Sequence, residues 1–197
     1  MSFKIVILGS GRGSNAEAIL KAEQAGRLGS VETVAILTDI PNAPILNLAK
    51  KFKKRGHCIP KVGEKARFNE EEEAAFLKEI LGFHPDLVVL AGFMRILDKS
   101  FIDALNGKII NLHPSLLPSF PGIDSIKQAF DYGVTITGCT VHWVTPALDA
   151  GPIIKQASVA INSDDTLDSL TEKVHQAEHE LLPSVIRKLS EQASKQA

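Results

Sequence analysis

The 197-residue chain alternates short apolar runs with segments in which apolar residues recur every three or four positions. The former pattern is typical of buried strands and the latter of amphipathic helices. Strands are expected at residues 3–8, 31–38, 57–60, 86–90 and 108–112. Helices are expected at residues 15–25, 43–55, 70–83, 99–105 and 124–132. This alternation predicts an α/β fold with an open, mostly parallel, Rossmann-like sheet flanked by helices.

The pattern changes near the C-terminus. Two further apolar runs, residues 137–144 and 153–161, are joined by a loop too short for a crossover helix, so we expect an antiparallel strand addition. A last helix is expected over residues 166–189, bent at Pro183, with residues 191–197 frayed. Because the chain is long enough for one well-formed core and marginal for two, we expect residues 1–197 to form a single domain.

Two runs of like charge stand at ends of the expected helices. Four glutamates follow Asn69, a favoured N-cap residue, and carboxylates stabilise the positive end of a helix. We interpret this run as capping and solvation. The basic run at residues 50–55 stands where a helix ends and favours cations. A nucleic-acid patch is the less favoured interpretation, because the formal net charge of the whole chain is only −1.

Composition narrows the class of partner. The near-neutral charge favours small-molecule substrates over nucleic acid. No window approaches the roughly 18 apolar residues of a membrane-spanning helix, so no membrane partner is expected. Cys58 and Cys139 are the only cysteines and lie far apart, which favours a reduced, cytoplasmic setting.

A glycine-rich loop, Gly9-Ser10-Gly11-Arg12-Gly13-Ser14-Asn15, joins the first strand to the first helix. Glycines let the backbone approach a ligand, and the free N–H groups of a helix start favour a phosphate. A dinucleotide site is an alternative, with Asp39 holding a ribose, but Ser14 replaces the third glycine of that fingerprint. A tight turn without a ligand is the third possibility.

Candidate chemistry follows the fifth strand. Asn111 and His113 stand two positions apart at its carboxyl end, so both side chains face one side of the sheet, and Pro114 keeps His113 extended. Open α/β sheets bind ligands at that edge. Asp149 lies in a rigid turn and would favour the imidazolium form of a neighbouring His113, as proton transfer requires. A histidine that only satisfies a strand end is the alternative for His113 alone.

Five separated motifs carry a resemblance to a known family. They are GSGRGSN (9–15), AGFMRIL (91–97), NLHPSLLPSFPG (111–122), GCTVHWV (138–144) and LDAGPII (148–154). In this order and spacing the chain resembles the folate-dependent formyltransferases along nearly its full length. The resemblance implies transfer of a formyl group from 10-formyltetrahydrofolate to the amine of 5-phosphoribosylglycinamide in purine biosynthesis. Formyl transfer to another amine, such as that of an initiator tRNA, and hydrolysis of the formyl folate are the alternatives, although relatives with those activities carry an additional domain.

The resemblance also implies roles for individual residues. Asn111, His113 and Asp149 match the catalytic set. The positions that match the phosphoribosylglycinamide site are Gly13, Ser14, Asn15 and Glu178. The positions that match the folate site are Met94, Arg95, Ile96, Leu97, Asn111, Thr145, Leu148 and Asp149. No metal is implied, and a monomer or homodimer is expected.

Other features are departures or competing patterns. His175 to His179 spells H-x-x-E-H, a zinc-peptidase pattern, but no third ligand is expected in the short remainder of the chain. Asp124 stands where the family often has a histidine, and Thr140 where serine is common. His142 is open between a site contact and a core residue. Arg67 is out of register with an upstream folate-contacting arginine of the family.

Overall fold

A computed structural model describes residues 2–61 and 66–195. Within these residues the strands are β1 (Phe3–Leu8), β2 (Val31–Thr38), β3 (Arg55–Cys58), β4 (Leu87–Leu90), β5 (Ile109–His113), β6 (Ile136–Trp143) and β7 (Ile153–Ala160). The helices are α1 (Ser14–Gln24), α2 (Ile45–Lys51), α3 (Glu70–Gly82), α4 (Lys99–Ala104), α5 (Ser125–Tyr132) and α6 (Leu167–Ser194). The alternation read from the sequence is therefore confirmed.

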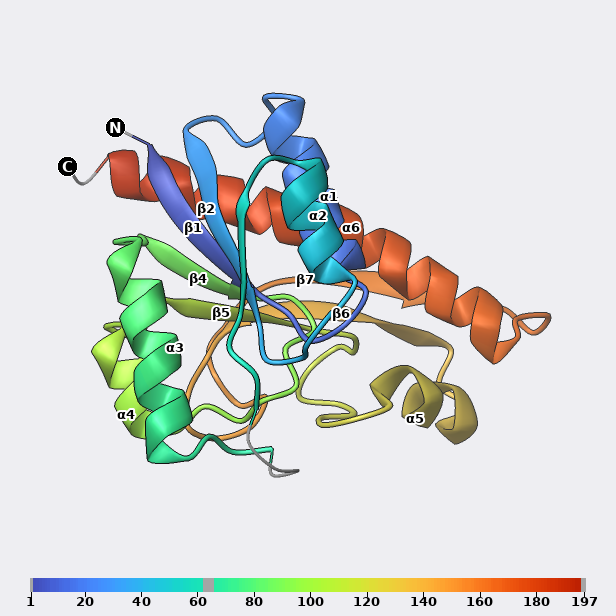
Figure 1. Ribbon diagram of the computed structural model, residues 1–197. Coiled ribbons are helices and arrows are strands. Elements are labelled where there is room, and N and C mark those ends of the chain that lie inside the picture. The colour runs from blue at the N-terminus through green and yellow to red at the C-terminus, as the bar shows by residue number, and fades with distance from the viewer. Residues whose placement is uncertain (1, 62–65, 196–197) are drawn as a thin grey trace.

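The described strands form one twisted sheet in the order β3-β2-β1-β4-β5-β6-β7 (Figure 1). The first five strands are parallel, whereas β6 is antiparallel to β5 and β7 is antiparallel to β6. The open, mostly parallel sheet with an antiparallel addition is thus confirmed. The strand order reverses between β1 and β4, and at such a point the loops diverge and leave a crevice for ligands.

Two apolar cores cover the two faces of the sheet. Helices α1, α2 and α6 pack on one face, and α3 and α4 pack on the other (Figure 1). All four residues of β4 are buried, as expected for a central parallel strand. Phe76 of α3 and Phe101 of α4 are almost fully buried, each contributing on the order of 2 kcal/mol of hydrophobic stabilisation. The sheet is therefore a rigid base for the loops at its edge.

Some boundaries differ from the sequence expectations. Helix α2 ends at Lys51 because Lys53 adopts a left-handed conformation (φ 55°), and β3 then begins at Arg55, two residues earlier than expected. Helix α6 continues through Pro183 to Ser194, so the expected fraying of residues 191–194 is wrong. Residues 196–197 lie outside the described residues.

Asn69 caps the start of α3, as expected, and does so within a capping box. Asn69 Oδ1 accepts from the Glu72 backbone N–H at 2.8 Å, and Glu72 Oε2 accepts from the Asn69 N–H at 2.8 Å. Glu72 is only 6% exposed, so the solvated interpretation of the acidic run is wrong for this residue. No helix in residues 2–61 and 66–195 is long and apolar enough to cross a membrane.

Candidate active site

Asn111, His113 and Asp149 meet on one face of the sheet. Asn111 and His113 of β5 pair with His142 and Thr140 of β6, so these four side chains share that face. The loop between β6 and β7 folds back over it and carries Asp149. Asp149 Oδ2 lies 3.4 Å from His113 Nδ1, and Asp149 Oδ1 lies 3.8 Å from His142 Nε2. Residues distant in sequence are therefore brought together.

The Asp149 loop is held by close backbone contacts. Gly151 lies so near β6 that a Cβ atom there would sit 1.7 Å from the Trp143 carbonyl oxygen, which only glycine avoids. Asp149 itself adopts a left-handed conformation (φ 49°). Its Oδ2 accepts a hydrogen bond from the Gly122 N–H at 2.8 Å. The carboxylate is thus fixed from two loops at once.

Both ring nitrogens of His113 face oxygen atoms. Nε2 lies 2.9 Å from the Phe120 carbonyl oxygen, which can only accept, so this nitrogen carries a hydrogen. Nδ1 faces the Asp149 carboxylate, which also only accepts. A doubly protonated imidazolium satisfies both contacts, and its charge offsets that of Asp149 in a buried setting.

His142 contacts the side chain of Asn111. Burial lowers the pKa of His142, against the opposing effects of its contact with Trp143 and the charge of Asp149. Nδ1 donates to the Trp143 carbonyl oxygen at 3.0 Å. In the neutral ring, which burial favours, Nε2 is the acceptor and takes a hydrogen bond from Asn111 Nδ2 at 3.2 Å. Sequence reasoning left His142 open between a site contact and a core residue; the structure places it in contact with the candidate residue Asn111.

The loop after β5 is anchored by a side-chain network. Thr140 Oγ1 donates to the Ser115 carbonyl oxygen (2.7 Å) and accepts from the Leu117 N–H (3.1 Å). Gln156 Nε2 donates to Thr140 Oγ1 at 3.0 Å and to the Leu117 carbonyl oxygen at 2.9 Å. This network fixes the loop that contacts both His113 and Asp149, and it explains why a hydroxyl is useful at position 140.

The glycine-rich loop reaches α6 at the same edge of the sheet. Gly13 is the N-cap of α1 with φ 79°, and a Cβ atom there would lie 2.6 Å from Ile45. Ser14 and Asn15 begin the helix, where backbone N–H groups are free. Asn15 Nδ2 donates to Glu178 Oε2 at 2.9 Å. Burial raises the pKa of Glu178, and the hydrogen bond from Asn15 partly offsets this.

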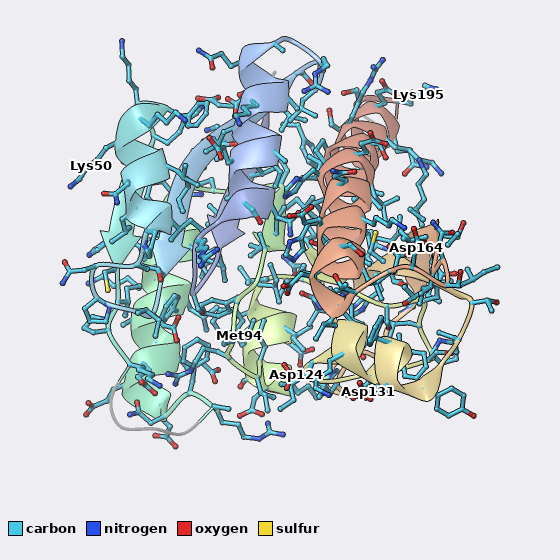
Figure 2. The ribbon with its side chains drawn as sticks, turned by 90° about the vertical axis from the view of Figure 1, so that its right-hand side faces the viewer. Lys50, Met94, Asp124, Asp131, Asp164 and Lys195 are labelled. Atoms are coloured by element: carbon cyan, nitrogen blue, oxygen red, sulfur yellow. The ribbon has the colours of Figure 1, made fainter. Side chains whose placement is uncertain are left out.

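The candidate folate positions come from two loops. Met94 and Leu148 are 67% and 62% exposed, unusual values for large apolar side chains. Figure 2 shows Met94 and Asp124 at the end of the molecule opposite Lys195. Ile96 and Thr145 are half-buried, and Leu97 is buried.

Arg95 differs from its neighbours because its side chain is buried. Nη2 donates to Glu72 Oε2 at 2.8 Å and to the Arg67 carbonyl oxygen at 3.0 Å, while the guanidinium stacks 4.5 Å from the Phe68 ring centre. Only its backbone is left for a ligand. Arg67, which sequence reasoning set aside, pairs with Ile96 through a β-bridge and forms an ion pair with Asp98. It therefore lies beside the candidate folate positions.

Three further features of the molecule lie outside the candidate catalytic set. His175 and His179 stack with ring centres 6.4 Å apart, but the described residues contain no cluster of three potential metal ligands. Asp124 is the left-handed N-cap residue of α5 without a capping side-chain bond. A cavity of about 560 Å³ is lined by Phe3, Lys108 and Trp143 among others, and none of its lining residues is a candidate site residue.

Comparisons with known proteins show the family of the chain. A family model described as formyl transferase matches residues 3–186. The phosphoribosylglycinamide formyltransferases of Bacillus subtilis (strain 168) and Escherichia coli (strain K12) are 40% and 38% identical. The first match covers 94% of each protein, and the second covers 92% of this chain and 84% of the relative.

A solved structure, glycinamide ribonucleotide transformylase 1 from Symbiobacterium toebii, superposes with a TM-score of 0.89 at 34% identity. The match covers 96% of this chain and 88% of that one. The family implies a folate co-substrate and an enzyme that acts on small molecules. The chain belongs to the formyl transferase family.

Proposed function

We propose that this enzyme transfers the formyl group of 10-formyltetrahydrofolate to the amine of 5-phosphoribosylglycinamide, a step of de novo purine biosynthesis. The observation that carries the proposal is the contact of His113 with Asp149 beside Asn111. It occurs in a chain 40% identical to a phosphoribosylglycinamide formyltransferase over 94% of both proteins.

The acceptor is assigned to the loop before α1 and to α6. Gly13, Ser14 and Asn15 offer N–H and side-chain donors at a helix start, which suits the substrate phosphate. Glu178 is held near them by Asn15 and is 4% exposed. Its carboxylate accepts hydrogen bonds from the glycinamide end, and this compensates for its burial. The proposed site therefore binds the anionic phosphate end of the substrate at the start of α1 and its N–H-bearing glycinamide end at Glu178.

The formyl donor is assigned to the exposed apolar side chains of Met94 and Leu148. These side chains supply contact surface for a flat aromatic ring system, and the buried Leu97 supports the segment. Arg95 and Ile96 contribute backbone groups, and Thr145 contributes a hydroxyl. Folate supplies a formyl group on nitrogen that an amine can attack.

Asn111, His113 and Asp149 act at the reacting carbon. As the amine attacks, negative charge develops on the formyl oxygen, and the Asn111 N–H and protonated His113 donate to it. His142 keeps the Asn111 carboxamide oriented by accepting its other N–H. Asp149 holds the imidazolium and assists transfer of a proton from the attacking amine to the folate nitrogen that carries the formyl group. The bond between that nitrogen and the formyl carbon then breaks, which releases tetrahydrofolate and the N-formyl product. To reach substrate, His113 Nε2 exchanges the Phe120 carbonyl for the formyl oxygen.

An acceptor assay tests the proposed function. Absorbance change of the folate is followed with phosphoribosylglycinamide, with initiator tRNA and with no acceptor. We expect turnover only with phosphoribosylglycinamide. Turnover without any acceptor would assign a hydrolase, and turnover with tRNA would assign a different acceptor.

A further inference from the structure

Ser10 bridges the two loops assigned to the two substrates. It belongs to the loop after β1, and its backbone N–H donates to the Gly92 carbonyl oxygen at 3.0 Å in the loop after β4. Its hydroxyl accepts from the Met94 N–H at 3.0 Å and donates to Asp39 Oδ1 at 2.6 Å. These contacts span the β1–β4 position, where the strand order reverses. The bridge thus lies where an α/β sheet opens toward ligands.

Asp39 fixes the orientation of the Ser10 hydroxyl group. It is 1% exposed, and a carboxylate can only accept, so the Ser10 hydroxyl hydrogen points to Asp39. The Ser10 lone pairs are then left for the Met94 N–H. Asp39 Oδ2 lies 4.0 Å from Arg95 Nη1, and Arg95 is bound in turn to Glu72. Asp39 is therefore occupied within the protein and is not available to hold a ribose.

We propose that Ser10 and Asp39 are positioning residues for the formyl donor. They fix the Met94 backbone, and with it the folate segment, relative to the phosphate loop. This inference rests on the proposed function. Neither residue is assigned a substrate contact, so their effect passes through Met94. Without the Ser10 hydroxyl, the Met94 N–H loses its acceptor and Asp39 Oδ1 loses its donor, so the Met94 segment becomes less well fixed.

Kinetics of Ser10→Ala test this role. Loss of one oriented hydrogen bond is expected to raise the KM for 10-formyltetrahydrofolate about 3- to 10-fold. The KM for phosphoribosylglycinamide and kcat are expected to stay within about two-fold, because the phosphate donors and catalytic residues are unchanged. Ser10→Thr keeps the hydroxyl and should restore the folate KM. Ser30→Ala is the matched control, since the Ser30 hydroxyl contacts that of Ser190, a residue with no assigned role.

An Asp39→Ala variant and the Ser10→Ala/Asp39→Ala pair complete the test. Because Asp39 acts through Ser10, the double variant should raise the folate KM no further than the worse single variant. The inference would be overturned if the rise in folate KM of the double variant equalled the product of the rises in the two single variants. An equal rise in both KM values, or an unchanged folate KM in Ser10→Ala, would also overturn it. If Asp39→Ala does not fold, the folate KM values of Ser10→Ala and Ser10→Thr still test the inference. Acceptor-dependent turnover of the wild-type protein tests the proposed function separately.

Discussion

Asn111 and His142 illustrate how far single residues can be interpreted from the sequence. The period of two along a strand places Asn111 and His113 on one face, and the structure has them there. The same reasoning cannot place His142 opposite Asn111, because the β5–β6 register depends on how the chain from Pro114 to Thr135 folds. Likewise, the sequence gives no sign that the Arg95 side chain is buried against Glu72.

Glu178 carries a prediction at the residue scale. Burial raises its pKa, so the charged form is less favourable in the folded than in the unfolded chain. Wild-type stability should therefore fall as pH rises through this pKa. Glu178→Gln removes the charge and keeps an acceptor for Asn15. At pH 8 we expect the free energy of unfolding of Glu178→Gln to be higher than that of the wild type. Below about pH 4, where Glu178 is protonated in both the folded and the unfolded chain, we expect this difference to vanish.

The same variant should bind the acceptor poorly. Loss of a charged acceptor is expected to raise the KM for phosphoribosylglycinamide by about 10-fold or more. Urea unfolding at several pH values and steady-state kinetics measure the two effects. Glu180→Gln, at an exposed position of the same helix, is the control. An identical pH dependence of stability in Glu178→Gln and wild type would contradict the account.

At the scale of elements, regular patterns were predictable and loop geometry was not. The strands of the sheet and the capping box at Asn69 follow from local sequence. The end of α2 does not, because Lys53 adopts the left-handed conformation at a position where glycine or asparagine would be the usual sequence signal, with Lys54 N–H bound to the Ala49 carbonyl oxygen. The fold-back of the loop carrying Asp149 also depends on a tertiary contact, between Gly151 and the Trp143 carbonyl. That loop completes the candidate site.

Gly151→Ala tests the importance of this fold-back. The new Cβ atom would overlap a backbone carbonyl, so the loop has to move and displace Asp149 from His113. A shift of about 1 Å at a catalytic group can cost on the order of 100-fold in rate, so kcat should fall at least about 10-fold. Gly82→Ala is the matched control, because a Cβ atom there meets nothing within 4 Å. Unchanged kcat in Gly151→Ala would show that the loop tolerates the displacement.

At the scale of the whole molecule, the candidate chemistry gathers at one side of the sheet. The glycine-rich loop, the loop after β4 and the carboxyl end of β5 converge there, as the strand-order rule leads one to expect. Helix α6 contributes Glu178 from the other end of the chain. Parallel topology therefore explains why separated motifs meet. The helix contact could not be inferred from the sheet pattern, because packing between α1 and α6 positions it.

The H-x-x-E-H pattern leads to a prediction for the intact enzyme. None of the proposed steps draws on a metal ion. Turnover should therefore be unchanged within error after treatment with a chelator and removal of the chelator. Kinetics together with elemental analysis before and after treatment measure this. Loss of activity that returns on adding zinc would assign His175 and His179 a role that the proposed mechanism lacks.

The most direct test of the central claim is kcat for the His113→Ala and Asp149→Asn variants with both substrates saturating. Circular dichroism and thermal unfolding verify that each variant is folded, and His57→Ala and Asp103→Asn serve as controls at exposed ion pairs. Removing the acid–base contribution should lower kcat by about 10²- to 10⁴-fold in both variants, with the controls near wild type. Near-normal kcat in folded His113→Ala protein would contradict the assignment.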